Sequence, residues 1–210
     1  MKVLALNGSP RKNGNTYQAL SAMRRILALS DIETEIVQLG DKAVRGCIAC
    51  GSCAKTGVCA LADEEFTQIT EKMVQADGLI LGSPVYYAGI NGTLKAFLDR
   101  AFYVNGSKLR HKVGCAVAVA RRNGGMPTFQ QLNNYFLISE MVVAPSYYWN
   151  VPHGSAPGDV LEDDEGMSIV KNLAQNMAWL LQMKQATAAT LPPPKPYPRQ
   201  YTDFVRSSHL

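Results

Sequence analysis

Four of the five cysteines lie within thirteen residues, in the pattern C-x2-C-x2-C-x5-C, at Cys47, Cys50, Cys53 and Cys59. Such close spacing lets several thiolates converge on one small volume, as ferredoxin-type cysteine runs do around an iron–sulfur cube. Gly46, Gly51 and Gly57 are interleaved with the cysteines, and glycine permits the positive-φ turns that wrapping a cluster requires. The sequence therefore predicts a [4Fe–4S] site with these four ligands.

Three other interpretations of the cysteines stay open. Disulfides are one, but the chain begins with a buried-strand pattern and no signal peptide, which predicts a reducing cytoplasm. Structural zinc is another, although it usually takes two separated C-x2-C pairs. The third is a loop that keeps its cysteines without binding a cluster. Cys115 lies apart, in an apolar run, and is predicted to be a buried strand residue.

A polar loop follows the first apolar run and reads NGSPRKNGNT over residues 7–16. It matches neither Walker A nor G-x-G-x-x-G. It nevertheless combines side-chain donors with positive charge at the start of a predicted helix, where the helix dipole favours an anion. The candidate phosphate ligands are Ser9, Arg11, Asn13, Asn15 and Thr16. The alternative is that these polar residues only cap the helix.

Two further loops follow predicted strands at the same edge of the sheet. The first contains Pro84, Val85, Tyr86 and Tyr87, which suit a planar ring with apolar area and polar edges. The second is glycine-rich and contains Asn123, Gly124 and Gly125. In open parallel sheets, ligands bind beyond the carboxyl ends of the strands at the switch point. A phosphate loop, a ring shelf and a glycine-rich loop together indicate flavin mononucleotide (FMN).

The elements that must position these loops alternate along the chain. Short apolar runs predict strands at 2–6, 33–39, 78–81, 112–120 and 141–144. Helical periodicity predicts helices at 16–29, 63–75, 93–104, 128–137 and 164–185, the second of them capped by Asp63. The third strand is expected to stop at Gly82-Ser83-Pro84. This alternation indicates an α/β fold with a parallel sheet.

Composition limits the function classes. The chain has 210 residues, a net charge of +4 and 47% apolar residues. Its basic residues are too scattered for a nucleic-acid footprint, and no apolar run approaches the ~18–20 residues of a membrane span. We expect one domain over 1–190, with a cluster loop at 43–62. A proline-rich tail over 191–210 is expected to extend over the surface or a second subunit.

Segment 147–162 is predicted to be irregular and is aromatic at its start. Residues 147–149 either form part of a subunit interface or continue the fifth strand into the core, and both interpretations stay open.

The motifs at 7–16, 82–87, 94–100 (LKAFLDR) and 122–125 resemble the NADPH-dependent FMN reductase branch of the flavodoxin-like superfamily. With the cysteine motif, residues 1–185 resemble the iron–sulfur flavoproteins of anaerobic bacteria and archaea. The resemblance implies a flavodoxin-like three-layer sandwich whose five-stranded parallel sheet has the order 2-1-3-4-5, with FMN at the switch point. It also implies a homodimer or a dimer of dimers, in which the cluster of one subunit lies close to the FMN of another.

We therefore expect a cytoplasmic oxidoreductase that uses FMN and a [4Fe–4S] cluster to join two-electron and one-electron chemistry. Candidate donors are reduced ferredoxin and NAD(P)H, and candidate acceptors are quinones, dioxygen, peroxide or a carrier protein. No catalytic acid–base residue is assigned. The alternatives are an FMN or quinone reductase without a cluster, a flavodoxin-like electron carrier and a zinc-stabilised interaction module. A net charge of +4 fits a carrier poorly, because such carriers are usually acidic.

Overall fold

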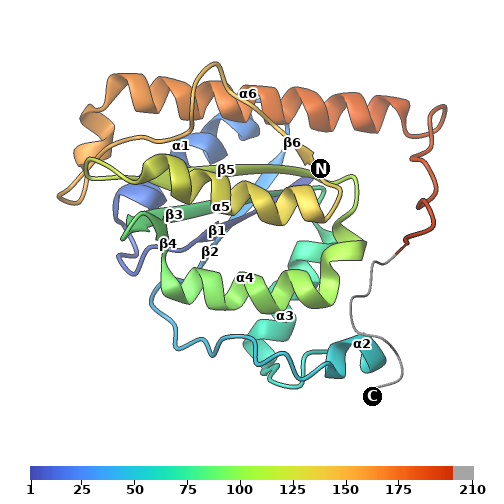
Figure 1. The fold of residues 1–210 in the computed structure, drawn as a ribbon. Helices are drawn as coiled ribbons and strands as arrows, with labels where there is room; N and C mark the ends of the chain where they lie inside the picture. The colour runs from blue at the N-terminus through green and yellow to red at the C-terminus, as the bar shows by residue number, and fades with distance from the viewer. Residues whose placement is uncertain (201–210) are drawn as a thin grey trace.

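The computed structural model describes residues 1–200, which form a three-layer α/β/α sandwich (Figure 1). The central sheet has the order β2-β1-β3-β5-β6, and its neighbouring strands are parallel. These strands are β1 (Lys2–Asn7), β2 (Glu33–Gln38), β3 (Gly78–Tyr86), β5 (Val113–Val119) and β6 (Val142–Val143). Counted without the short β4 (Gly89–Ile90), which pairs antiparallel with β3, this is the predicted order 2-1-3-4-5. The flavodoxin-like architecture is confirmed.

The alternation of side chains along β1 explains why both faces of the sheet are covered. Val3 and Ala5 pack with α1 (Asn15–Ala28) and α6 (Asp164–Thr187), while Leu4 and Leu6 pack with helices on the opposite face. The opposite face carries α3 (Glu64–Gln75), α4 (Gly92–Asn105) and α5 (Gly125–Ile138). Successive strand residues point to opposite faces, so a strand buried on both sides is apolar throughout.

Local signals set the starts of two helices next to the candidate site. The carboxylate of Asp63 accepts from the Phe66 N–H at 2.7 Å, which confirms the predicted cap of α3. The side chain of Asn91 accepts from the N–H groups of Thr93 and Leu94 at the start of α4. Side-chain acceptors of this kind replace the missing hydrogen bonds of the first helical turn. The cap of α3 was predicted from the sequence, whereas the cap of α4 was not.

The predicted end of the third strand was wrong. β3 continues through Gly82-Ser83-Pro84 to Tyr86, because Ser83 and Pro84 lie opposite Ala118 and Val119 of β5. Pairing with a neighbouring strand overrides weak local propensity.

Helix α5 also begins earlier than predicted, at Gly125. Pro127 therefore lies in its first turn, where a missing N–H costs no helical hydrogen bond.

Residues 147–149 do not enter the core. The side chains of Tyr147, Tyr148 and Trp149 are each more than half exposed, so their interpretation as a continuation of the fifth strand into the core was wrong. The chain returns to the sheet directly afterwards, where Ala118 N donates to Asn150 O at 3.0 Å and Ala120 N donates to Pro152 O at 3.1 Å. Apart from the 3-10 turn η2 (Asp159–Glu162), segment 147–162 is irregular, as predicted.

Three further expectations from the sequence can be compared with the structure. Cys115 is fully buried in β5, as predicted, and burial raises the pKa of its thiol. Across residues 1–200, no helix is both long and apolar enough to cross a membrane. Residues 191–200 of the predicted tail are exposed, and residues 201–210 lie outside the described part of the chain.

Candidate functional site

The loop after β1 is folded against the end of β3. The Gly8 N–H donates to the carbonyl of Gly82 at 2.8 Å, which joins the two strand ends. Ser9 is buried, and its N–H donates to Asn7 Oδ1 at 3.1 Å. Its hydroxyl accepts from the Arg11 N–H at 3.2 Å. These bonds curl the loop around the amino end of α1.

The first turn of α1 has unused hydrogen-bond donors. Its N-cap is Gly14, no side chain caps the helix, and no acidic residue lies in the first turn. The first bond back to the cap runs from Gln18 N to Gly14 O at 3.0 Å, so the N–H groups of residues 15–17 have no helical partner. The polar side chains of the loop therefore do not serve as caps. The end of the helix dipole favours an anion at this position.

Asn15 connects this loop to a distant segment. Its carboxamide donates to Ala156 O at 2.9 Å and accepts from the N–H groups of Gly158 and Val160 at 2.9 and 3.3 Å. Arg11 adds a bond from Nη1 to Ser155 O at 3.2 Å. Segment 155–160 thus forms one wall of the phosphate loop. The sequence contains no signal for this wall, because about 140 residues separate the partners.

The ring shelf is a tight hairpin. Tyr87 and Ala88 connect β3 to β4 with φ of +49° and +56°, a conformation that costs non-glycine residues about 1–2 kcal/mol each. Backbone strain of this kind persists when the surrounding structure fixes the conformation, and it is common at ligand-binding sites. Pro84 and Val85 are partly buried, whereas Tyr86 is half exposed and Tyr87 fully exposed. The hairpin therefore presents two aromatic rings to solvent.

The glycine-rich loop lies directly against this hairpin. Gly124 has φ of +88°, and a Cβ added there would lie 2.9 Å from Ala88 Cα and 3.0 Å from Val85 Cγ1. Only glycine combines this backbone conformation with so close an approach. Asn123 is exposed beside it, and Gly125 is buried. The structure therefore brings the three predicted flavin loops together at one edge of the sheet.

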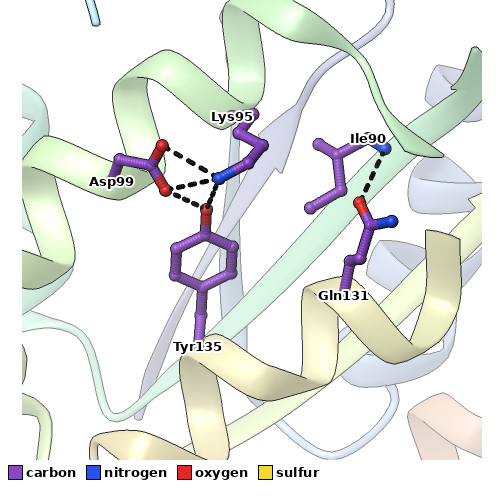
Figure 2. A network of polar contacts seen from close by, with 5 residues as sticks. All are labelled: Ile90, Lys95, Asp99, Gln131 and Tyr135. Atoms are coloured by element: carbon purple, nitrogen blue, oxygen red, sulfur yellow. Dashed lines mark hydrogen bonds and ion pairs between the residues drawn. The ribbon is translucent and has the colours of Figure 1, made fainter. Parts of the chain in front are cut away.

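Polar contacts connect helices α4 and α5 with each other and with the end of the hairpin at Ile90 (Figure 2). Gln131 Oε1 accepts from the Ile90 N–H at 3.4 Å, and Tyr135 donates from its hydroxyl to Asp99 at 2.5 Å. Lys95 donates to both oxygens of Asp99 at 2.8 and 2.9 Å. Burial and the hydrogen bond to Asp99 raise the pKa of Tyr135. Helices α4 and α5 are thereby tied together next to the shelf.

A cleft of about 370 Å³ opens beside the glycine-rich loop. Tyr148 and Trp149 line it, with ring centroids 4.7 Å apart, together with Arg122 and His153. The main-chain N–H of His153 donates to Asp163 Oδ2 at 2.6 Å. The aromatic run was visible in the sequence, but its position next to the flavin loops was not.

The four clustered cysteines line one small pocket of about 20 Å³. Their segment contains one short unpredicted helix, α2 (Ser52–Thr56), which has Gly51 at its N-cap with φ of +70° and Gly57 at its C-cap with φ of +72°. The predicted positive-φ turns are confirmed at these two glycines but not at Gly46, while Ala49 adopts φ of +52°. All four thiols are free; Cys47 and Cys50 are exposed, and Cys53 and Cys59 are half buried.

Arg100 of α4 also lines this pocket, and it was not among the predicted site residues. Its Nε donates to Cys59 Sγ at 3.4 Å, while Nη1 and Nη2 donate to the carbonyls of Arg45 and Leu61 at 3.3 and 2.5 Å. One side chain thus holds both ends of the cysteine segment. The only signal was that Arg100 ends the motif LKAFLDR.

The pocket fits an iron–sulfur cluster by the chemistry of its donors. Four thiols and one buried guanidinium surround it, and thiolates are the ligands that hold such clusters. Within residues 1–200, no group of three Cys, His, Asp or Glu side chains is arranged to hold a single metal ion.

The two candidate sites lie at opposite ends of α4. The hairpin and the loop after β1 lie near its amino end, whereas α2 lies near its carboxyl end (Figure 1). The 14 residues of α4 span about 21 Å at 1.5 Å per residue. Within one chain the cysteine pocket is therefore well separated from the flavin loops.

Comparison with known proteins finds related sequences that cover most of the chain. The sequence pattern of the family described as NADPH-dependent FMN reductase matches residues 1–156. An iron–sulfur flavoprotein of Methanocaldococcus jannaschii is 41% identical over 191 residues, which is 87% of this chain and 98% of the relative. An iron–sulfur flavoprotein of Methanosarcina thermophila is 32% identical over 191 residues, with 88% and 97% covered.

Solved structures support the fold. RosB, solved with a bound riboflavin-phosphate derivative, superimposes with a TM-score of 0.71 at 17% identity, covering 98% of this chain and 92% of RosB. An NAD(P)H:quinone oxidoreductase from Methanothermobacter marburgensis superimposes with a TM-score of 0.62 at 16% identity, covering 84% and 96%.

Proposed function

Because the chain belongs to the NADPH-dependent FMN reductase family, and within it to the iron–sulfur flavoproteins, we propose that it carries a [4Fe–4S] cluster in addition to FMN. Membership makes it a flavin-dependent oxidoreductase. Its function would be to pass electrons between ferredoxin or NAD(P)H and a small-molecule or protein acceptor. When bound, FMN supplies two-electron and one-electron chemistry, and a cluster supplies one-electron chemistry.

The chain's own residues would bind and orient the flavin. The free N–H groups at the start of α1 would hold the phosphate, together with Ser9, Arg11, Asn13, Asn15 and Thr16. Arg11 and Lys12 supply the only positive side chains of this loop, and charge-assisted bonds to phosphate are among the stronger ones. The ring would lie against residues 84–87 and the loop at Asn123, Gly124 and Gly125. The contact of Gly124 with Val85 and Ala88 supports this placement.

The cysteine pocket carries the proposal of a cluster. Cys47, Cys50, Cys53 and Cys59 would each ligate one iron, since all four line a single pocket and none is in a disulfide. The exposure of Cys47 and Cys50 places this pocket at the surface. The buried side chain of Arg100 lies on its inner side. Loop 43–62 would thus be an insertion in an FMN-binding domain of residues 1–190, followed by the tail 191–210.

The separation of the two sites along α4 supports a route between subunits. We propose a homodimer or dimer of dimers in which the cluster of one copy faces the flavin of another. The exposed aromatic residues Tyr147, Tyr148 and Trp149 are candidates for the interface, because large exposed apolar groups often mark one. Sedimentation combined with rapid kinetics tests this route. A monomer that transfers electrons between both centres at full rate would exclude it.

Chemical analysis of anaerobically purified protein tests the function. We expect about four irons and four sulfides per chain, with about one FMN. Protein purified in air is a weaker test, because an exposed cluster can be lost to oxidation. Anaerobic protein that contains FMN but no iron would instead support the FMN or quinone reductase without a cluster. Stoichiometric zinc would contradict the cluster directly.

A further inference from the structure

Arg100 is a buried cation without an acidic partner in the described part of the chain. Its side chain lies in α4, and only 4% of the residue is exposed. Two of its three acceptors are neutral carbonyls, those of Arg45 and Leu61. None of the ion pairs among residues 1–200 includes Arg100. Burying an unpaired charge is strongly unfavourable, so an anion is needed beside this guanidinium.

The surroundings of Arg100 indicate where that anion lies. Arg100 Cζ lies 4.1 Å from the centroid of the Phe66 ring, which covers the guanidinium. Each Nη atom donates a hydrogen bond to a main-chain carbonyl at one end of the cysteine segment. The third nitrogen, Nε, donates to Cys59 Sγ at 3.4 Å in the pocket that the four cysteines line. The positive charge is therefore directed at the sulfur ligands of the proposed cluster.

We propose that Arg100 is a positioning residue that supplies the counter-charge of the cluster and raises its reduction potential. This inference rests on the proposed function. Four thiolates give a cluster net negative charge, and reduction adds one more. A hydrogen bond to a ligand sulfur and a nearby positive charge both stabilise the more negative state; these are the factors that set iron–sulfur potentials. The same guanidinium fixes both ends of segment 45–61, so it also fixes where Cys59 lies.

Redox titration of the purified holoprotein, followed by electron paramagnetic resonance, tests the proposal. In Arg100→Gln we expect the equilibrium constant for one-electron reduction of the cluster to fall about tenfold, which corresponds to about 59 mV. Arg100→Lys keeps the charge and loses the planar fork, so its midpoint should lie closer to that of the wild type. FMN content should be unchanged in both variants, because Arg100 does not contact the flavin loops.

Arg24→Gln is the matched control. Arg24 is exposed on α1, across the sheet from α4 (Figure 1), so the same loss of charge should leave the cluster midpoint unchanged. If Arg24→Gln shifts the cluster midpoint as much as Arg100→Gln does, the change in net charge alone explains the shift, and the proposed local role of Arg100 is overturned.

The outcomes separate the two proposals. A wild-type protein without a cluster contradicts the proposed function and this inference together. A wild type with a cluster and an Arg100→Gln variant with an unchanged midpoint overturn only the inference. Loss of the cluster from Arg100→Gln but not from Arg100→Lys supports the role of the charge. If Arg100→Gln and Arg100→Lys shift the cluster midpoint equally, or lose the cluster equally, the proposed role of the charge is overturned.

Discussion

The side-chain amide of Asn15 donates to the main-chain carbonyl of Ala156 at 2.9 Å. This bond joins the first turn of α1 to the wall of the phosphate loop, across most of the chain's length. The same carboxamide accepts from Gly158 N at 2.9 Å, and Asn15 is buried. A residue predicted to contact phosphate therefore also shapes the site.

Replacing Asn15 tests this double role. Asn15→Ala leaves buried backbone groups unpaired, which costs about 1–3 kcal/mol of the free energy of unfolding per group. Asn15→Asp keeps the two acceptor bonds but adds a negative charge beside the phosphate. We expect Asn15→Asp to weaken FMN binding more than it lowers stability. Denaturant unfolding of the apoprotein and fluorescence titration with FMN measure the two effects. Equal FMN affinity in Asn15→Asp and the wild type would place the phosphate elsewhere.

Arg11→Ala should weaken FMN binding about ten- to a hundredfold. Arg11 is exposed, and its side chain bonds only to Ser155 O in the described structure, so loss of this side chain should barely affect folding. A hydrogen bond to a charged group contributes about 1.5–3 kcal/mol, which sets the expected change in the dissociation constant. Arg24→Ala, at an exposed position of α1, is the control and should bind FMN normally. An unchanged dissociation constant in Arg11→Ala would contradict the assignment.

Gly124→Ala and Gly57→Ala form a matched pair. Both glycines have positive φ, +88° and +72°, so both substitutions should cost about 1–2 kcal/mol of stability. A new Cβ at position 124 also collides with Ala88 and Val85, whereas nothing lies within 4 Å at position 57, which is in the cysteine segment. Only Gly124→Ala should therefore displace the shelf and weaken FMN binding. Titration of both variants checks this, and similar affinities would mean that the shelf does not hold the ring.

Tyr135 makes stability depend on alkaline pH. Its pKa is raised by burial and by the hydrogen bond to Asp99, so the folded state prefers the protonated phenol. The stabilisation is complete below the unfolded pKa of about 10 and is lost as the pH rises above it. The loss is below about 1.4 kcal/mol per pH unit, because the partly exposed ring is screened by solvent. Urea unfolding at several pH values should show a steeper decline above pH 10 for the wild type than for Tyr135→Phe. Parallel curves would contradict this origin.

Cys53→Ala and Cys115→Ala separate ligands from core cysteines. Cys53 lines the cysteine pocket, whereas Cys115 is buried in β5 with its sulfur 3.6 Å from Met177 Sδ. We expect Cys53→Ala to lower bound iron in anaerobic preparations and to leave FMN content unchanged. Cys115→Ala should keep its iron. Full iron occupancy in Cys53→Ala would remove Cys53 from the ligand set.

The sequence was sufficient wherever the signal lies within a short stretch of chain. The buried run of β1, the cap formed by Asp63 and the periodicity of α4 depend on residues within a few positions of one another, and all three were predicted. The pocket lined by the four cysteines was likewise predictable, because residues within one short loop lie close together in space. The alternation of strands and helices predicted an α/β fold with a parallel sheet, and the strand order was predicted from the resemblance to flavodoxin-like proteins.

Tertiary structure alone decided what depends on partners distant in the chain. β3 passes its predicted end because β5 pairs with Pro84. Arg100 meets Cys59, 41 residues away, and Asn15 meets Ala156, 141 residues away. No local pattern encodes such contacts, because closing a long loop depends on packing of the whole core rather than on the residues at its ends. The sequence by itself determined which residues could bind flavin and iron; the fold determined which side chains stand behind them and how far apart the two sites lie.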